Sequence, residues 1–392
     1  MTEELQDKKT PLHDEHVALG AAMTGFGGWL MPLRYTSDLA EHRAVREAAG
    51  LFDLSHMGEV HLEGPGAGAA LDHALVGAAS AIAVGRARYS MICAEDGSVL
   101  DDLIVYRLGD EHFLVVANAG NAELVARELV ARAAGFDAVV TDRSAETALV
   151  AVQGPRAEEI VAAVTTPGDV EAVRALRYYA SAPVTLRTGD AGAGGEVAVL
   201  AARTGYTGED GFELFVPAEH ARALWAALLA AGEGHGLVPA GLSARDSLRL
   251  EAGMPLYGHE LDTTTTPYEA GLGRVVRLDK VDAQGAPVDF VGRAALQARK
   301  DSPPARVLVG LRGQGRRPAR AGYDVVRPDA DGAPGARVGT VTSGAPSPTL
   351  GYPVAMAYVT PEVSAEGTEL AVDVRGRAEP FVVVPLPFYQ RS

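Results

Sequence analysis

The sequence predicts an α+β protein of two or three domains that ends in a β-barrel or sandwich. Three observations predict this fold class. The chain has 392 residues, more than one ordinary core holds. Hydrophobic residues make up 47% and charged residues 22%, a balance typical of globular proteins. Helical and extended patterns are mixed in the first part, whereas from about Arg306 onward short strands alternate with Gly/Pro turns.

Charge and cysteine content exclude several function classes. The net charge of −16 argues against a nucleic-acid partner and against an anionic membrane surface. The one cysteine, Cys93, permits no intramolecular disulfide, and the ten histidines lack metal-ligand spacing, so no metal is expected. The polar start at residues 1–9 is no secretion signal, and no apolar run approaches the roughly 20 residues of a membrane helix. The sequence therefore predicts a soluble, cytoplasmic protein.

Helices are expected where an apolar stripe lies between capping and stopping residues. Ser37 is expected to cap one of them and Gly50 to end it, and Trp225 is expected in the core. Ser243 begins a capping-box pattern, Ser-Ala-Arg-Asp, before a helix that ends at Gly253. The other boundaries give helices at 38–48, 122–134, 156–164 and 220–231.

Strands are expected between these helices and in the C-terminal part. Residues 88–94, 99–108 and 112–118 form a predicted meander, and residues 299–305 a predicted linker. The other expected strands are 197–202, 212–216, 307–311, 337–343, 354–359, 370–374 and 381–384.

The turns of the meander predict a group of polar side chains. Taken as a two-residue hairpin turn, Asp96-Gly97 places Asp102 opposite Met91, with Tyr89 as its diagonal neighbour. A three-residue loop at 109–111 then places Asp102 opposite Asn118, while Asp101 points to the other face. Under the alternative, both acids are solvated at a strand entrance, and the pattern alone slightly favours that alternative.

A glycine-rich run at residues 203–213 predicts a tight turn between two strands. Glu213 would then be a carboxylate within an apolar strand, suited to the N–H donors of a heterocycle. An exposed edge strand with Glu213 in water is the alternative, and the pattern alone favours it. Arg245 lies in the first turn of its helix, where the helix dipole disfavours a cation by about 0.3–1 kcal/mol. It can serve an acidic ligand, although a surface salt bridge is the commoner explanation.

Several motifs, in order along nearly the whole chain, together resemble one family. They begin at Thr10 (Thr-Pro-Leu-His), Phe26 (Phe-Gly-Gly-Trp), Phe52 (Phe-Asp-Leu-Ser-His-Met-Gly), Asp101 (Asp-Asp-Leu-Ile-Val), Thr204 (Thr-Gly-Tyr-Thr-Gly-Glu-Asp-Gly-Phe-Glu), Ala244 (Ala-Arg-Asp-Ser-Leu-Arg) and Pro387 (Pro-Phe-Tyr-Gln-Arg). Each motif is weak alone, but the set is specific. The chain thus resembles the T-protein family of the glycine cleavage system.

The resemblance implies a three-domain clover-leaf fold with a C-terminal β-barrel and a central folate channel. Residues 1–51 and 147–275 would form a folate-binding domain, interrupted by an α+β domain at 52–146, and residues 285–392 the barrel domain. The implied enzyme is an aminomethyltransferase. It would move a one-carbon unit from lipoylated H-protein, its partner, to tetrahydrofolate as co-substrate. The products would be 5,10-methylenetetrahydrofolate, ammonia and dihydrolipoyl H-protein, and neither a metal nor a flavin is expected.

The resemblance also implies site residues. Asp102 would be catalytic, because it matches the second position of the Asp-Asp-Leu motif. The positions that match folate-binding or channel residues are Met57, Tyr89, Asn118, Tyr206, Glu213, Arg245 and Arg391. Arg274 stands where the family usually has Trp, a change expected to alter a packing or surface contact.

Two alternatives share the implied fold. One is another folate-dependent demethylating enzyme, such as the sarcosine and dimethylglycine dehydrogenases, but this chain lacks the N-terminal GxGxxG of their flavin domain. The other is a non-catalytic folate-binding relative with a Lys-Gly-Cys-Tyr-type motif. The corresponding stretch here begins at Glu251 and reads Glu-Ala-Gly-Met-Pro-Leu-Tyr, without a cysteine.

Overall fold

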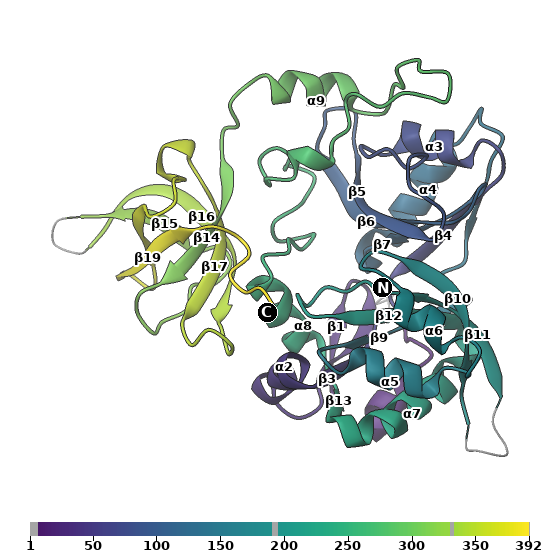
Figure 1. Cartoon of the computed structure of the whole chain (residues 1–392). Coiled ribbons are helices and arrows are strands. Elements are labelled where there is room, and N and C mark those ends of the chain that lie inside the picture. The colour runs from purple at the N-terminus through teal and green to yellow at the C-terminus, as the bar shows by residue number, and fades with distance from the viewer. Residues whose placement is uncertain (1–6, 190–194, 330–332, 392) are drawn as a thin grey trace, which may run out of the picture. The chain divides into compact units, whose positions relative to one another are not determined.

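The computed structural model describes residues 7–189, 195–329 and 333–391 (Figure 1). The chain divides into two compact units. Unit 1 comprises Met1–Ala74, Ala78–Tyr89 and Leu103–Arg245, and unit 2 comprises Leu75–Gly77, Ser90–Asp102 and Asp246–Ser392.

Most of the polar start, on which the predicted lack of a secretion signal rests, falls on residues 1–6, outside the described residues. No helix within the described ranges is long and apolar enough to cross a membrane.

Within its described residues, unit 1 holds a six-stranded sheet in the order β10-β11-β12-β9-β3-β13. Neighbouring strands are antiparallel except for β3 and β13, which run parallel. Because β12 lies between β11 and β9, it is an interior strand, and all but its last residue are buried. The strands are β10 (Ser181–Arg187), β11 (Glu196–Ala202), β12 (Gly211–Pro217), β9 (Thr147–Gln153), β3 (Ala49–Asp53) and β13 (Leu237–Pro239).

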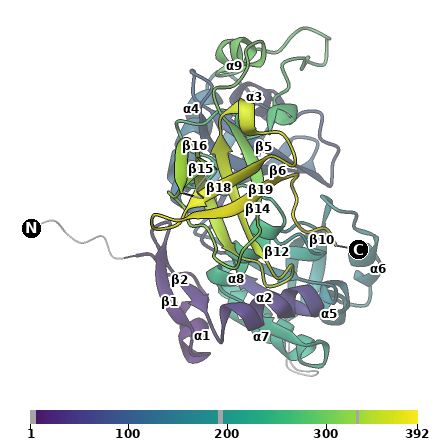
Figure 2. The same cartoon turned by 90° about the vertical axis from the view of Figure 1, so that its left-hand side faces the viewer.

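Two amphipathic helices, α5 (Ala157–Val164) and α7 (Ala221–Gly232), pack on this sheet and lie beside each other in Figures 1 and 2. Their apolar side chains form one core with the sheet, and Trp225 within it is 1% exposed, as predicted. Burying each large apolar side chain of this kind contributes about 1.5–3 kcal/mol. The core therefore fixes the strands that carry the site described below.

Ser37 caps α2 (Asp38–Glu47) as predicted, and its hydroxyl accepts a hydrogen bond from the backbone N–H of Ala40 at 3.2 Å. The expectation that Gly50 ends this helix is wrong, because Gly50 lies within β3. A Cβ at Gly50 would lie 2.5 Å from Cγ2 of Val45. Close packing of helix against strand, and not helix termination, therefore explains this glycine.

The capping-box prediction for α8 (Leu242–Glu251) is also wrong. The helix begins one residue before Ser243, so that side chain lies inside the helix. At the helix start the N–H of Gly241 donates to the Glu41 carboxylate at 2.9 Å, a favourable place for an anion. Arg245 still falls in the first turn, and the helix ends before Gly253, which has a φ of +65°.

The remaining elements before the barrel include a short N-terminal hairpin and one helix near the predicted linker. α9 reaches Lys300, so the linker predicted at 299–305 is helical at its start. The hairpin is β1 (Ala22–Phe26) and β2 (Trp29–Arg34), and the other α-helices are α1 (His13–Ala18), α3 (Ala67–Ala74), α4 (Ala122–Arg132), α6 (Val170–Ala175) and α9 (Arg293–Lys300). The 3₁₀ turns are Ala119–Asn121, Ala218–His220, Glu233–His235, Gly273–Val275 and Pro361–Val363.

A five-stranded sheet in the order β5-β6-β7-β4-β8 contains the predicted meander. The division between the two units falls inside β5 and β6, so Asp102 belongs to unit 2 and Leu103 to unit 1. The strands are β5 (Arg86–Cys93), β6 (Val99–Gly109), β7 (His112–Ala117), β4 (Gly58–Glu63) and β8 (Val139–Asp142).

Both predicted turns of the meander differ in length from the structure. The first loop has three residues, because the N–H of Ala94 donates to the carbonyl of Ser98 at 2.9 Å. The argument that placed Met91 opposite Asp102 assumed a two-residue loop and therefore loses its basis. In the second turn Gly109 pairs with His112 across a two-residue loop, and a bulge before Gly109 restores the register.

The C-terminal part of unit 2 is a closed barrel in the order β14-β17-β16-β15-β18-β19, which β14 and β19 close (Figure 1). The mixed helices and sheets followed by this barrel confirm the predicted fold class. The sequence missed β15, a short strand whose pairing with β16 is interrupted by register shifts. The strands are β14 (Val307–Gly313), β15 (Asp324–Pro328), β16 (Pro334–Pro346), β17 (Pro353–Val359), β18 (Glu369–Asp373) and β19 (Ala378–Val384).

Candidate functional site

Glu213 lies on the interior strand β12 and is 9% exposed. The alternative of an exposed edge strand is therefore wrong. Its Oε2 atom accepts a hydrogen bond from the hydroxyl of Tyr106 at 3.2 Å and another from the hydroxyl of Thr204. The two hydroxyls are 3.0 Å apart. Oε2 is thus fully engaged, whereas Oε1 accepts no hydrogen bond from the described residues.

Burial controls the protonation of this cluster. It raises the pKa of Glu213, and the Thr204 hydroxyl, the Arg245 charge and the Tyr106 hydroxyl partly oppose that rise. Burial and the nearby Glu213 carboxyl also raise the pKa of Tyr106 well above its usual value. Tyr106 therefore stays a neutral donor, and the neutral form of Glu213 is stabilised relative to that of a carboxyl group in water.

Arg245 and Tyr206 lie together beside this carboxyl. The guanidinium carbon of Arg245 is 4.8 Å from the centroid of the Tyr206 ring, within the range of a cation–π contact. Both side chains are partly exposed. Because the same guanidinium charge lowers the pKa of Glu213, the three residues form one electrostatic group in unit 1.

The loop that carries Tyr206 is held by two buried side chains. The Gln153 amide donates to the carbonyl of Thr204 and accepts from the Thr207 hydroxyl, both at 3.0 Å. Arg46 binds the carbonyl of Thr207 at 2.7 Å and pairs with Glu209 at 2.9 Å. These contacts hold the loop from behind, which fixes the position of the Tyr206 backbone.

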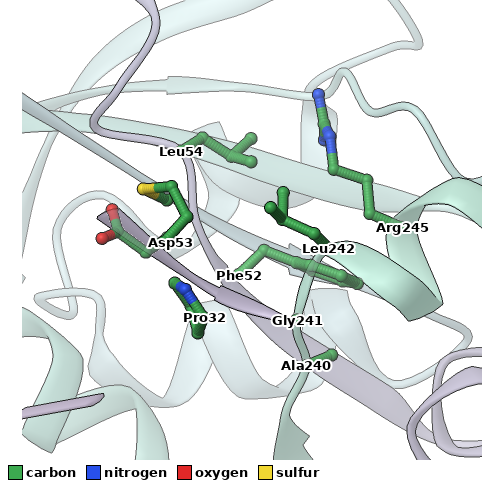
Figure 3. Close-up of a pocket in the computed structure, with 9 residues that line it drawn as sticks. Pro32, Phe52, Asp53, Leu54, Ala240, Gly241, Leu242 and Arg245 are labelled. Carbon is green, nitrogen blue, oxygen red and sulfur yellow. The ribbon is translucent and has the colours of Figure 1, made fainter. Parts of the chain in front are cut away.

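A small pocket opens beside Arg245 in unit 1 (Figure 3). Arg245 and Asp53 lie at opposite ends of this view, and the apolar side chains of Leu54 and Leu242 lie between them. The pocket is lined by Met31, Pro32, Phe52, Asp53, Leu54, Ala240, Gly241, Leu242 and Arg245. It is apolar apart from the two charged groups, as small-molecule sites commonly are.

Asp53 is the buried anchor of this pocket. Its Oδ2 accepts from the Thr10 hydroxyl at 2.6 Å and contacts Nε2 of His16 at 2.8 Å, and its Oδ1 accepts from the N–H of Ser55 at 2.9 Å. Tyr35 completes the chain, with its hydroxyl 2.9 Å from Nδ1 of His16. Although burial opposes ionisation, His16 and the two hydrogen-bonded residues keep the pKa of Asp53 below its usual value.

The structure places the other predicted residues of unit 1 as follows. Met57 is half-buried in the turn after β3, Tyr89 is half-buried on β5, and Asn118 follows β7 and is also half-buried. Leu103 on β6 pairs with Ala117 on β7. This register has the same offset as the predicted pairing of Asp102 with Asn118. That pairing itself stays a prediction. The diagonal place of Tyr89 relied on the two-residue loop that also placed Met91, and it loses its basis with that loop.

Two predicted residues belong to unit 2. Asp102 is half-buried on β6, whereas its neighbour Asp101 is 0% exposed. This difference agrees with the expectation that the two side chains point to opposite faces. Arg391 is exposed near the C-terminal end of the described residues, and Arg274 is exposed in a 3₁₀ turn.

Sequence reasoning missed two residues of the site. Tyr106 lies four residues after Asp102 on β6, so the period-two alternation of the strand could have indicated it. Asp53 lies inside the motif that begins at Phe52, but only its contacts reveal what it does. Within the described ranges, no group of three or more His, Cys, Asp or Glu residues is arranged to hold a metal ion.

Comparisons with known proteins identify the class of this fold and site. The model described as GCVT N-terminal domain matches residues 12–280. The model described as glycine cleavage T-protein C-terminal barrel domain matches residues 306–390. The chain is therefore a two-part protein in which an N-terminal region of the T-protein type precedes the matching barrel.

Individual relatives agree along the whole length. The aminomethyltransferase of Saccharopolyspora erythraea is 57% identical over 385 residues, covering 98% of this chain and 99% of its own. That of Streptomyces coelicolor is 57% identical over 389 residues and covers 98% of each chain. The crystal structure of glycine cleavage system aminomethyltransferase T from Bartonella henselae has a TM-score of 0.84 at 38% identity and covers 98% of both chains. The chain belongs to the glycine cleavage T-protein family, which confirms the resemblance.

Proposed function

We propose that this chain is the aminomethyltransferase of a glycine cleavage system. It transfers the one-carbon unit from the aminomethyl-dihydrolipoyl arm of H-protein to tetrahydrofolate. The products are 5,10-methylenetetrahydrofolate, ammonia and dihydrolipoyl H-protein. The observation that carries this conclusion is 57% identity with proteins named aminomethyltransferase over 98% of the chain.

The chemistry of the site in unit 1 fits a reduced folate. A folate presents adjacent N–H donors on its pterin ring and carboxylates on its glutamate tail. Glu213 has one carboxyl oxygen engaged by Tyr106 and Thr204 and a second oxygen available for N–H donors. Arg245 supplies a local positive charge in a chain of net charge −16. These two residues would therefore hold the pterin edge and an anionic part of the substrate.

The remaining folate contacts are proposed from the motifs and from their positions. Tyr206 lies under the Arg245 guanidinium, so it would fix the orientation of that cation. Met57, Tyr89 and Asn118 are half-buried in unit 1 and would line the bound substrate. Arg391, exposed in unit 2, would add positive charge for the folate tail.

Asp102 is the proposed catalytic residue. It would bind the substrate near its reactive nitrogens and accept or return a proton as nitrogen attacks the one-carbon unit and ammonia leaves. Most of the rate gain would come from holding the two reactants in position, because they meet as parts of one complex. The partial burial of Asp102 supports this role, since the carboxylate can reach a ligand without losing all contact with water.

The finer organisation is proposed with the function. Residues 1–51 and 147–275 would form the folate domain, residues 52–146 the inserted domain, and residues 285–392 the barrel domain. Lipoylated H-protein would be the macromolecular partner, with no nucleic acid or membrane involved. Reaction in the cytoplasm is consistent with this partner, and cell fractionation would test it.

The decisive experiment mixes the purified protein with H-protein loaded with an aminomethyl group, with and without tetrahydrofolate. Folate-dependent ammonia release is expected. A protein that binds folate but releases no ammonia would instead be the non-catalytic relative. Activity on sarcosine or dimethylglycine, without activity on H-protein, would indicate the demethylating alternative.

A further inference from the structure

Tyr106 connects two sheets through a single hydroxyl group. It lies on β6, an interior strand of the five-stranded sheet, and it is 0% exposed. Its hydroxyl donates at 3.2 Å to Oε2 of Glu213 on β12, an interior strand of the six-stranded sheet. Both residues belong to unit 1. Because each strand is paired on both sides, the two ends of this hydrogen bond are fixed by their sheets.

The ring of Tyr106 has a packing partner of its own. It meets the ring of Phe215 edge-on, with the ring centroids 5.5 Å apart. Phe215 lies two residues after Glu213 on β12 and therefore on the same face of that strand. A phenylalanine at position 106 would keep this contact, so packing alone does not account for the hydroxyl group.

The hydroxyl group controls which oxygen of Glu213 is available to a ligand. Tyr106 and Thr204 both donate to Oε2, the first from β6 and the second from the loop before β12. Oε1 accepts no hydrogen bond from the described residues, yet it does not belong to the buried polar atoms that lack a partner, so it keeps contact with solvent. A ligand can therefore reach Glu213 at Oε1, while two donors from different segments hold Oε2.

A glutamate side chain needs such anchors before it can orient a ligand. It rotates about three side-chain bonds, and ordering a side chain of this kind during binding reduces the affinity. With Oε2 of Glu213 anchored in advance, less order has to be gained when a ligand docks at Oε1. The Tyr106 hydroxyl is thus placed to improve binding without touching the ligand.

We infer that Tyr106 is a positioning residue for the folate substrate: its hydroxyl holds Oε2 of Glu213 so that Oε1 is aligned for the N–H donors of the pterin ring. The inference rests on the proposed function, because Glu213 is its proposed pterin contact. It deepens that proposal by giving a role in substrate binding to a residue that the motif comparison left without one. Tyr106 acts through Glu213 alone, so its own burial is no obstacle to this role.

The experiment measures binding of 5-formyltetrahydrofolate, a stable reduced folate, by calorimetric titration of the full chain. Tyr106→Phe removes the hydroxyl and keeps the ring with its packing. Tyr358→Phe is the matched control, because Tyr358 is also buried and its hydroxyl donates to the carbonyl of Glu260 at 2.7 Å. Tyr358 lies on β17 of the barrel in unit 2, and neither it nor Glu260 is a proposed folate contact.

Tyr106→Phe is expected to weaken folate binding by about five- to tenfold, the effect of one hydrogen bond. Tyr358→Phe should change the affinity by less than about twofold. Equal affinity of Tyr106→Phe and the parent protein would overturn the inference. A loss of the same size in Tyr358→Phe would overturn it too, because any buried tyrosine hydroxyl would then have the same effect.

The pH dependence of binding separates a positioning role from a purely structural one. Burial raises the pKa of Glu213, whereas the Thr204 hydroxyl, the Arg245 charge and the Tyr106 hydroxyl lower it. N–H donors bind the ionised carboxylate, so the affinity should rise with pH as Glu213 ionises. The midpoint of that rise should lie at higher pH in Tyr106→Phe and stay at the parent's value in Tyr358→Phe. An unshifted midpoint in Tyr106→Phe would overturn the inference, since the hydroxyl would then not act through Glu213.

These outcomes separate the two proposals. If the parent protein binds no reduced folate, the proposed function fails. If the parent binds folate and Tyr106→Phe binds it equally well with the same pH dependence, only the inference about Tyr106 fails.

Discussion

The guanidinium of Arg245 lies over the ring of Tyr206, with its carbon 4.8 Å from the ring centroid. The arginine comes from the first turn of α8, where the helix dipole disfavours a cation. The ring comes from the loop that Gln153 and Arg46 hold from behind. The contact therefore joins two separately fixed segments and places a cation where it lowers the pKa of Glu213.

Replacing Arg245 should show whether folate binding requires a planar guanidinium or only a positive charge. Arg245→Lys keeps the charge but loses the planar stacking, so folate binding should weaken, and Arg245→Ala should weaken it further. Both variants remain testable by titration with a reduced folate. Equal affinities of the Lys variant and the parent protein would show that charge alone is sufficient.

Glu213 should impose a pH dependence on stability. Its pKa is raised in the folded state above the ordinary 4.5, so the folded protein binds a proton that the unfolded chain has lost. Stability from this group is fully present below about pH 4.5 and falls as the pH rises through the folded pKa. Glu213→Gln removes the titration, so its melting temperature should fall less over that range than the parent's. Parallel melting curves for the two proteins would contradict this prediction.

Asp102→Asn should retain folate binding but lose about 10²–10⁴-fold in turnover, the usual contribution of a general acid or base. The assay is release of methylenetetrahydrofolate from aminomethyl-loaded H-protein. Asp101→Asn is the informative neighbour, because Asp101 is fully buried and its replacement should mainly lower stability. Turnover at the parent rate in Asp102→Asn would show that this residue is only structural.

The stability cost of replacing Gly205 by alanine should depend on the side chain of Gln153. A Cβ at Gly205 would lie 2.0 Å from the amide oxygen of Gln153, so Gly205→Ala should cost about 1–3 kcal/mol. Adding Gln153→Ala removes the obstructing amide. Urea unfolding of the single and double variants should therefore show non-additive changes in free energy. If the free-energy changes of the two substitutions simply add, the loop accommodates the alanine side chain at position 205 without moving the Gln153 amide.

Local patterns predicted α2, α4, α5, α7, α8 and about half of the strands, because capping and period-two alternation act over a few residues, but they missed β1–β4, β8–β10, β13 and β15. Ser37, Trp225 and the strand that carries Glu213 are examples of correct predictions. The failures had tertiary causes: Gly50 is small because Val45 packs against it, and the carboxylate that accepts from the Gly241 N–H just before α8 comes from Glu41, 201 positions before the Leu242 at which the helix begins.

For the site, the sequence indicated types of residue more readily than contacts. Glu213 and Arg245 stood out as charges in unfavourable positions, yet the pattern alone preferred a solvated Glu213. Its burial depends on β9 and β11 on either side, which no local pattern reports. Tyr106, distant in sequence from Glu213, became visible only through its hydrogen bond.

The paired hydroxyls of Tyr106 and Thr204 on one oxygen of Glu213 have a thermodynamic consequence. The pKa of this carboxyl is raised while the site is empty, and N–H donors of a pterin ring that dock against it would lower that pKa, so that any proton it carries is released. The heat measured on mixing protein and folate should then vary with the ionisation enthalpy of the buffer. Comparing phosphate with Tris at one pH would count the protons released, and in Glu213→Gln that count should fall.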